Sequence, residues 1–213
     1  MNSLTDTQNP DQGAPYEPEH VRQHRTDRLR HLGLDDPSSD EAFERFARLA
    51  ASLTEAPLAM VNFVSDELQM FRGLLAPTGS REDGVVFDMP DLDRTMPLHY
   101  GFCPHVVANH SPLALHDVLA YPRFKGNPVV DELGVRAYIG APIVDDTNTI
   151  IGTVCALDLQ PREESMWRER RQDMQRLADA LLSEIRVRDL LARSRQQSMA
   201  AETDPYNRTL PAE

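Results

Sequence analysis

Hydrophobic residues recur at three- and four-residue steps between Phe43 and Leu53, which predicts an amphipathic helix with one apolar face. Ser38 precedes this pattern and Glu41 follows three positions later. We therefore expect Ser38 to be the N-cap and Glu41 to complete a capping box. Pro57 lacks the amide hydrogen that a continuing helix needs, so the helix should end before it.

A longer helical pattern covers residues 163–195, where apolar residues from Trp167 to Leu190 follow the helical spacing and arginines and acids fill the opposite face. At 1.5 Å per residue this helix would reach up to about 50 Å, more than a small domain needs to cover its sheet. A shorter helix with a weak apolar face is expected over residues 19–33.

Four apolar runs have the length and composition of strands, at 58–64, 68–75, 135–144 and 149–157, with short polar turns inside each pair. Between the pairs we expect a helix over 101–109, a strand over 113–116, a turn capped by Asp117, and a short helix capped by Asn127. Residues 76–97 carry five acids and two arginines and are expected to form a long loop.

This order of elements predicts an α+β fold with an antiparallel sheet, whose faces are covered by short helices and by the terminal helices. The expected organisation is a flexible tail (1–18), an N-terminal helix and linker (19–35), a central domain (36–162), a long amphipathic helix (163–197) and a second flexible tail (198–213).

Composition narrows the function. The 213 residues (24.0 kDa) suffice for one domain with helical extensions and leave no room for an effector domain. A net charge of −12 opposes binding to nucleic acid or to anionic membranes. The sequence contains no apolar run of membrane-spanning length and no signal-peptide core, so we expect a cytoplasmic protein whose Cys103 and Cys155 are reduced thiols.

A series of short motifs resembles the GAF domain family, a small-molecule sensory module common in bacterial signalling proteins. The segment Phe102-Cys103-Pro104-His105 is similar to the FCxH segment of that family. The other motifs, in order, are 46–57, Gln69 and Phe71, 112–117, 122–124, 127–128, 134–136, Tyr138, 140–142, 151–155, Asp158 and 161–162. Together they cover about residues 36–162.

The resemblance implies a GAF-like six-stranded antiparallel sheet, with short helices over a ligand pocket on one face and the N- and C-terminal helices on the other. It does not identify a ligand. The signature of cyclic-nucleotide-binding members is not met, and Pro104 separates Cys103 from His105, which differs from bilin-binding members. Sulfoxide reductases of this fold use cysteines in a different sequence context.

The candidate pocket residues are aromatic, thiol-bearing, polar or charged, and the two arginines among them could bind an anionic group. The candidates are Phe63, Phe71, Phe102, Cys103, His105, Asp117, Arg123, Phe124, Asn127, Arg136, Tyr138 and Cys155. The alternative is structural: the aromatic rings would be core, the two arginines would pair with Asp117 or Asp131, and Asp117 and Asn127 would be caps.

Five metal-binding residue types fall within eighteen positions, at His99, Cys103, His105, His110 and His116. A zinc site needs about four ligands, and the paired C-x-x-C spacing is missing, so neither a metal nor another cofactor is predicted, although haem or bilin stays an alternative. A redox-active Cys103 beside His105 is also an alternative, whereas Cys155 in an apolar strand is expected to be inert.

We therefore expect a sensory domain, without enzymatic activity, that binds an unknown small molecule and signals to a separate effector protein. Homodimerisation through the C-terminal helix is expected because that helix outruns the sheet. The alternatives are a ligand-free dimeric interaction module and a thiol-based redox sensor or reductase that uses Cys103. No nucleophile elbow, phosphate loop or dinucleotide fingerprint is found in the sequence.

Overall fold

The computed structural model describes residues 17–76, 79–80, 86–87 and 94–203. Five helices are present in these ranges: α1 (Glu19–His31), α2 (Glu41–Thr54), α3 (Cys103–Asn109), α4 (Pro128–Asp131) and α5 (Glu164–Thr203). The strands are β1 (Leu58–Val64), β2 (Leu68–Leu75), β3 (Gly79–Ser80), β4 (Val86–Phe87), β5 (Thr95–Pro97), β6 (Leu113–Leu115), β7 (Ala137–Val144) and β8 (Ile150–Asp158). Two short 3-10 turns, η1 (Val118–Ala120) and η2 (Pro122–Phe124), complete the fold.

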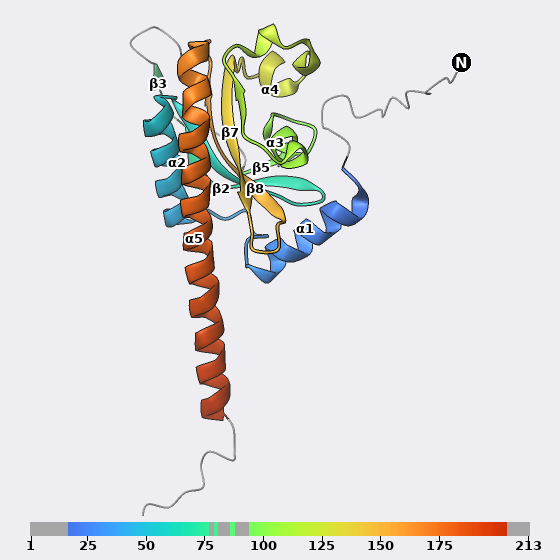
Figure 1. The fold of residues 1–213 in the computed structure, drawn as a ribbon, viewed down its shortest axis with the longest axis vertical. Helices are drawn as coiled ribbons and strands as arrows, with labels where there is room; N and C mark the ends of the chain where they lie inside the picture. Colours follow the sequence, from blue (N-terminus) through green and yellow to red (C-terminus); the bar gives the residue numbers. More distant parts are fainter. Residues whose placement is uncertain (1–16, 77–78, 81–85, 88–93, 204–213) are drawn as a thin grey trace, which may run out of the picture.

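Six strands form one antiparallel sheet in the order β5-β2-β1-β8-β7-β6 (Figure 1). This confirms the predicted α+β class and the six-stranded sheet. β1 and β2 have the bounds that the sequence predicts, because a short turn reverses the chain between them and every residue of β1 is buried.

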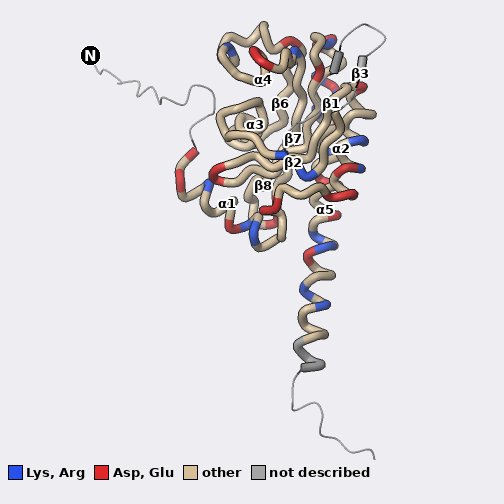
Figure 2. Tube along the Cα trace, turned by 180° about the vertical axis from the view of Figure 1, so that it is seen from behind, with Lys and Arg blue, Asp and Glu red and all other residues tan. Residues whose placement is uncertain are grey.

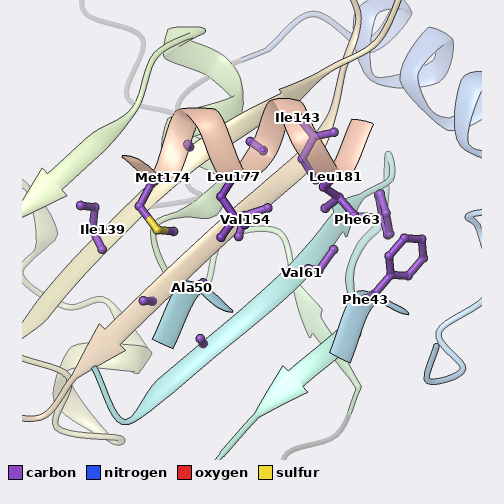
Figure 3. Packing of buried hydrophobic residues seen from close by; sticks show 14 of the residues in the cluster. Phe43, Ala50, Val61, Phe63, Ile139, Ile143, Val154, Met174, Leu177 and Leu181 are labelled. Carbon is purple, nitrogen blue, oxygen red and sulfur yellow. The ribbon is translucent and has the colours of Figure 1, made fainter. Parts of the chain in front are cut away.

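α2 and α5 pack side by side on one face of the sheet, which we call the sealed face (Figure 1). Strand residues that point to this face include Val61, Phe63 and Val154, and they are fully buried. Met174, Leu177 and Leu181 of α5, among others, cover them (Figure 3). Burying this much aliphatic surface is the main stabilising contribution of the sheet.

The other face, which we call the pocket face, is covered by α3, α4 and the two 3-10 turns (Figure 1). Successive strand residues point to opposite faces, so Met60 and Asn62 lie on the pocket face while Val61 lies on the sealed face. The core here mixes aromatic rings with sulfur-containing side chains. α3 carries no Lys, Arg, Asp or Glu (Figure 2).

α1 lies across one end of the sheet, at the turns between strands (Figure 1). Its Arg28 side chain donates a hydrogen bond to Asp145 in the β7–β8 turn at 2.7 Å, and Nε of Arg25 donates to the carbonyl oxygen of Val64 at 2.8 Å. These contacts explain why a segment with a weak apolar face is helical and ordered against the domain.

The start of α2 corrects one sequence prediction. The N-cap is Asp40, not Ser38: the Asp40 carboxylate accepts hydrogen bonds from the amides of Ala42 (2.9 Å) and Phe43 (3.4 Å). Ser38 instead donates its hydroxyl to Asp36 at 2.7 Å. Glu41 is the first helical residue, so the predicted capping box does not form.

The expected long loop over residues 76–97 is also corrected where the structure describes it. It contains β5, which pairs with Leu68–Met70 of β2 and forms one edge of the main sheet, and the small β3–β4 hairpin. The rest of the loop lies outside the described residues.

α5 continues six residues past the predicted end of the long helix, to Thr203, and extends well beyond the sheet (Figure 1). Its protruding part carries both basic and acidic side chains (Figure 2). Within the described ranges, no helix combines the length and the apolar character that crossing a membrane requires. The predicted flexible tails, at 1–18 and 198–213, fall largely outside the described residues.

Candidate functional site

A largely apolar cavity of about 40 Å³ lies between the pocket face of the sheet and the layer formed by α3 and α4, and we call it the pocket. The sheet contributes eight of its lining residues: Leu58, Met60, Gln69, Phe71, Met96, Tyr138, Cys155 and Leu157. The covering layer contributes Gly101, Phe102, Cys103, Val129, Leu133 and Val135. The pocket therefore depends on segments that are far apart in the sequence.

Strand register places the deepest residues of the pocket. Cys155 of β8 lies between Met60 of β1 and Gly140 of β7, one on each side. Gly140 leaves room for the ring of Tyr138: a Cβ at this position would lie 2.2 Å from the Tyr138 hydroxyl oxygen. The missing side chain at Gly140 thus allows the Tyr138 hydroxyl to reach across β7 toward α3.

Two cysteines meet at the base of the pocket. The Sγ atoms of Cys103 and Cys155 are 3.6 Å apart, and the Tyr138 hydroxyl donates a hydrogen bond to Cys103 Sγ at 3.4 Å. Hydrogen bonding from the Cys155 thiol, with smaller contributions from Thr153, Tyr138 and Asn62, holds the pKa of Cys103 below its ordinary value, although burial opposes this. Burial raises the pKa of Cys155 instead.

Buried amides support the floor of the site. Asn62 donates from Nδ2 to Gln69 Oε1 at 2.9 Å, and Gln69 donates to the carbonyl oxygens of Pro97 and Tyr100, both at 2.8 Å. These bonds hold the segment that leads into α3. Among the described residues, Asn62 Oδ1 is buried with no hydrogen-bond partner, which is uncommon in a well-packed core.

Asn127 joins the two halves of the covering layer. Its side chain accepts a hydrogen bond from the amide of Gly101 at 3.0 Å and donates to the Gly101 carbonyl oxygen at 2.9 Å. The same oxygen accepts from the amide of Val129 at 3.1 Å and caps α4. A single side chain therefore fixes α4 to the residues that precede α3.

One residue connects the pocket to α5. The ring of Tyr138 lines the pocket, while its backbone carbonyl oxygen accepts a hydrogen bond from Nε1 of Trp167 at 2.8 Å. Trp167 lies in the first turn of α5, is fully buried and is the only tryptophan of the chain. This hydrogen bond joins a strand that lines the pocket directly to the first turn of the long helix.

Five candidates from the sequence come together in the pocket: Phe71, Phe102, Cys103, Tyr138 and Cys155. Three others lie beside it. Phe124 packs against Phe102 and His105, with ring centroids 5.1 Å and 4.9 Å apart, and Asn127 holds the covering layer as described above.

Four candidates lie elsewhere. Phe63 points to the sealed face and packs against Phe43, with ring centroids 5.3 Å apart. Arg136 forms a bidentate ion pair with Asp117 at 2.8 Å and 3.1 Å, which is the structural alternative that the sequence left open. Arg123 is exposed and stacks over the Phe124 ring at 4.7 Å.

Sequence reasoning missed the aliphatic and thioether lining, above all Met60, Met96 and Leu157, and the buried amide of Gln69. Residues two apart on one strand share a face of the sheet. Met60 therefore lies on the same face as Leu58, and Leu157 lies on the same face as Cys155. The pattern did not reveal this, because both faces of β1 and β8 are buried and no polar residue marks the alternation.

The histidines and the cysteine that lie close together in the sequence between His99 and His116 do not come together as a metal site in the described part of the chain. No group of three or more His, Cys, Asp or Glu side chains is placed to hold a metal ion there. A second, more polar depression of about 290 Å³ lies beside β6 and the start of α5, and includes His116, Tyr121 and Arg168.

Comparison with known proteins agrees with this geometry. The GAF domain family model matches residues 38–185. A cyclic di-GMP phosphodiesterase of Pseudomonas aeruginosa is 30% identical over 150 residues, which is 70% of this chain but only 23% of that protein.

Solved structures share the fold at low sequence identity. A free methionine-R-sulfoxide reductase from Neisseria meningitidis, in complex with its substrate, superposes with a TM-score of 0.53 at 12% identity and covers 84% of this chain and 96% of its own. The PixJ GAF domain of Thermosynechococcus elongatus, in its blue-light absorbing form, gives a TM-score of 0.52 at 17% identity, covering 80% and 94%.

Proposed function

The chain belongs to the GAF domain family, and on that premise we propose that it is a sensory domain that binds a small molecule in the pocket and signals to a separate partner protein through α5. The observation that carries this proposal is the double role of Tyr138. Its ring lines the pocket and its carbonyl oxygen is hydrogen-bonded to Trp167 of α5. A ligand that favours one position of Tyr138 shifts the population of α5 positions in proportion to its differential affinity.

The pocket supports an uncharged, compact ligand. Its lining is aliphatic, aromatic and sulfur-containing, and the two candidate arginines are exposed or paired outside it. The centres of water-sized molecules can occupy about 40 Å³ of it, whereas one water molecule needs roughly 10–15 Å³ on the same measure, so the space suits a small molecule. A larger ligand requires α4 to move outward, and the Asn127 bonds to Gly101 are the contacts that this movement would break.

We propose that the chain acts by binding and not by catalysis, and that it needs no resident cofactor. The phosphodiesterase named above is similar to this chain over less than a quarter of its length, so its activity gives little support for the same activity here. The support for a binding role is the family membership and the mainly apolar pocket.

Two signals from one sample test the binding proposal. Unfolding temperature and Trp167 fluorescence are measured against a panel of amino acids, cyclic mono- and dinucleotides, short-chain fatty acids and small aromatic compounds. A ligand of the folded state raises the unfolding temperature, and through Tyr138 it also changes the Trp167 emission. Failure of every compound to change either signal would favour the ligand-free interaction module.

Matched variants locate the binding site. Val129→Phe fills the pocket and should abolish the response, whereas Leu49→Phe places the same ring at an exposed position on α2 and should preserve it. A response that survives Val129→Phe would place the ligand elsewhere.

We also propose that α5 pairs with α5 of a second copy. Val187, Leu190 and Leu191 expose 52%, 65% and 52% of their surface at the three- and four-residue spacing of one helix face. In sedimentation velocity experiments, Leu190→Asp should convert a dimer into a monomer. Leu119→Asp is the control, because Leu119 is 62% exposed but lies on η1, away from α5. A monomeric wild-type chain would contradict the pairing.

A further inference from the structure

The two cysteines at the base of the pocket are 52 positions apart in the sequence, yet their sulfur atoms are 3.6 Å apart. We propose that Cys103 and Cys155, here called the thiol pair, react with a hydroperoxide inside the pocket and form an intramolecular disulfide. An S–S bond is about 2.0 Å long, so the sulfur atoms need to approach by roughly 1.6 Å, and rotation of the side chains next to an empty cavity can supply this.

The two thiols are not equivalent. Cys103 keeps 5% of its surface accessible, at the start of α3, whereas Cys155 is fully buried in β8. The Tyr138 hydroxyl donates to Cys103 Sγ, and hydrogen bonding led by Cys155 favours the Cys103 thiolate, while burial favours the protonated form of Cys155. A thiolate is the nucleophilic form of cysteine. Cys103 is therefore the attacking residue and Cys155 the resolving residue.

The surroundings add a second observation. Thr153, on the same strand as Cys155, is fully buried, and its hydroxyl is a hydrogen-bond partner of both thiols. Together with the Tyr138 hydroxyl it can hydrogen-bond to the oxygen atoms of a peroxide.

The chemistry balances with hydrogen peroxide as the oxidant. The Cys103 thiolate attacks one peroxide oxygen, the O–O bond breaks, and the leaving hydroxide takes up a proton to form water, which leaves Cys103 as a sulfenic acid. The Cys155 thiol then attacks the Cys103 sulfur, the S–O bond breaks, and a second water leaves with the Cys155 proton. A dithiol reductant reverses the reaction through thiol–disulfide exchange.

Pocket size selects the oxidant. A cavity of about 40 Å³ admits a molecule with two oxygen atoms, while a peptide disulfide such as glutathione disulfide is far too large. The resulting bond ties α3 to β8 next to Tyr138. The transmission of this change to α5 rests on the function proposed above, whereas the reaction at the sulfur atoms does not.

The experiment treats the reduced full-length chain with one equivalent of hydrogen peroxide, then alkylates the remaining thiols under denaturing conditions and measures the intact mass. Two alkyl groups are expected before oxidation, none after it, and two again after dithiothreitol. Because Met60 and Met96 also line the pocket, a gain of one oxygen alone is not diagnostic, and dimedone is used to trap sulfenic acid.

The variants separate the two roles. In Cys155→Ala, peroxide should produce a dimedone adduct on Cys103 and no disulfide. In Cys103→Ala, the remaining thiol should react at least tenfold more slowly. Tyr138→Phe keeps both thiols and should slow disulfide formation several-fold. This variant provides a further test if an alanine variant fails to fold. Trp167 emission shows whether each variant is folded.

Two results would overturn the proposal. One is a folded wild-type chain whose thiols both stay alkylatable after peroxide, although the urea-unfolded chain loses them. The other is equally fast oxidation by glutathione disulfide, which would mean that the pocket does not select the oxidant. The peroxide experiment uses no ligand, so it is independent of the binding proposal. If no compound of the panel binds but the disulfide forms, only the binding proposal is refuted. If a compound binds but no disulfide forms, only the proposed reaction of the thiol pair is refuted.

Discussion

The two faces of the central sheet differ in what they bury. The sealed face meets two long helices and contains a continuous hydrophobic cluster, whereas the pocket face meets short helices and retains a cavity, two thiols and buried amides. Close packing without polar groups maximises stability. The pocket face is less closely packed and is therefore expected to contribute less stability. Its thiols and buried amides are groups that can bind a ligand or react.

Removing one aromatic ring from each face tests whether the two faces differ in packing. Phe63→Ala should cost about 3–5 kcal/mol of unfolding free energy, because the buried ring packs against Phe43 and leaves a cavity. Phe71→Ala should cost no more than the lower end of that range, since its ring already borders a cavity. Urea unfolding measures both, and equal losses would show that the faces are packed alike.

Two glycines allow the same comparison for added volume. A Cβ on Gly73 would lie 2.2 Å from the backbone oxygen of Phe43 in α2, so Gly73→Ala should cost about 1–3 kcal/mol or more. A Cβ on Gly140 would be equally close, but to the end of the Tyr138 side chain and not to backbone. Gly140→Ala should therefore cost less in urea unfolding and should slow disulfide formation. A larger loss of stability in Gly140→Ala than in Gly73→Ala would contradict the proposed difference between the two faces.

Ionisation of Asp40 tests the contact between the start of α2 and Arg188 of α5. Although burial acts in the opposite direction, hydrogen bonds from Arg188 and the α2 amides hold the pKa of Asp40 below its ordinary value. A carboxyl group whose pKa is lower in the folded state stabilises the fold at pH values above its unfolded-state pKa of about 3.9. This stabilisation is lost as the pH falls through the folded-state pKa.

Asp40→Asn keeps a good N-cap and removes the charge. It should cost about 0.5–1.5 kcal/mol near neutral pH, with a difference from the wild type that shrinks below about pH 4. Unfolding curves at a series of pH values measure this. A difference that stays constant with pH would assign the loss to packing and not to the ion pair.

The smallest effect is expected on the outside of the pocket face. Arg123 is exposed and contacts only the Phe124 ring among the interactions described, so Arg123→Ala should change stability by less than about 0.5 kcal/mol. The ligand response should also be unchanged. A lost response would restore Arg123 as an anion-binding residue and would weaken the proposal of an uncharged ligand.

The order and type of the main elements follow from the sequence alone. β1 and β2 have the predicted bounds, and the caps at Asp117 and Asn127 form as predicted, since each depends on neighbouring residues. The N-cap of α2 was wrong because Ser38 and Asp40 offer the same local signal. β5 was missed because three residues acquire strand structure only through their partner, β2.

The site needed the tertiary structure. Both faces of β1 and β8 are buried, so their sequences carry no alternation that would assign Phe63 to the sealed face or Met60 to the pocket. Cys155 in an apolar strand reads as inert, and only the packing of α3 on the sheet brings the Cys103 sulfur to 3.6 Å from it. Local propensity and periodicity determine elements, whereas contacts between distant segments depend on strand register and packing, which no short stretch of sequence encodes.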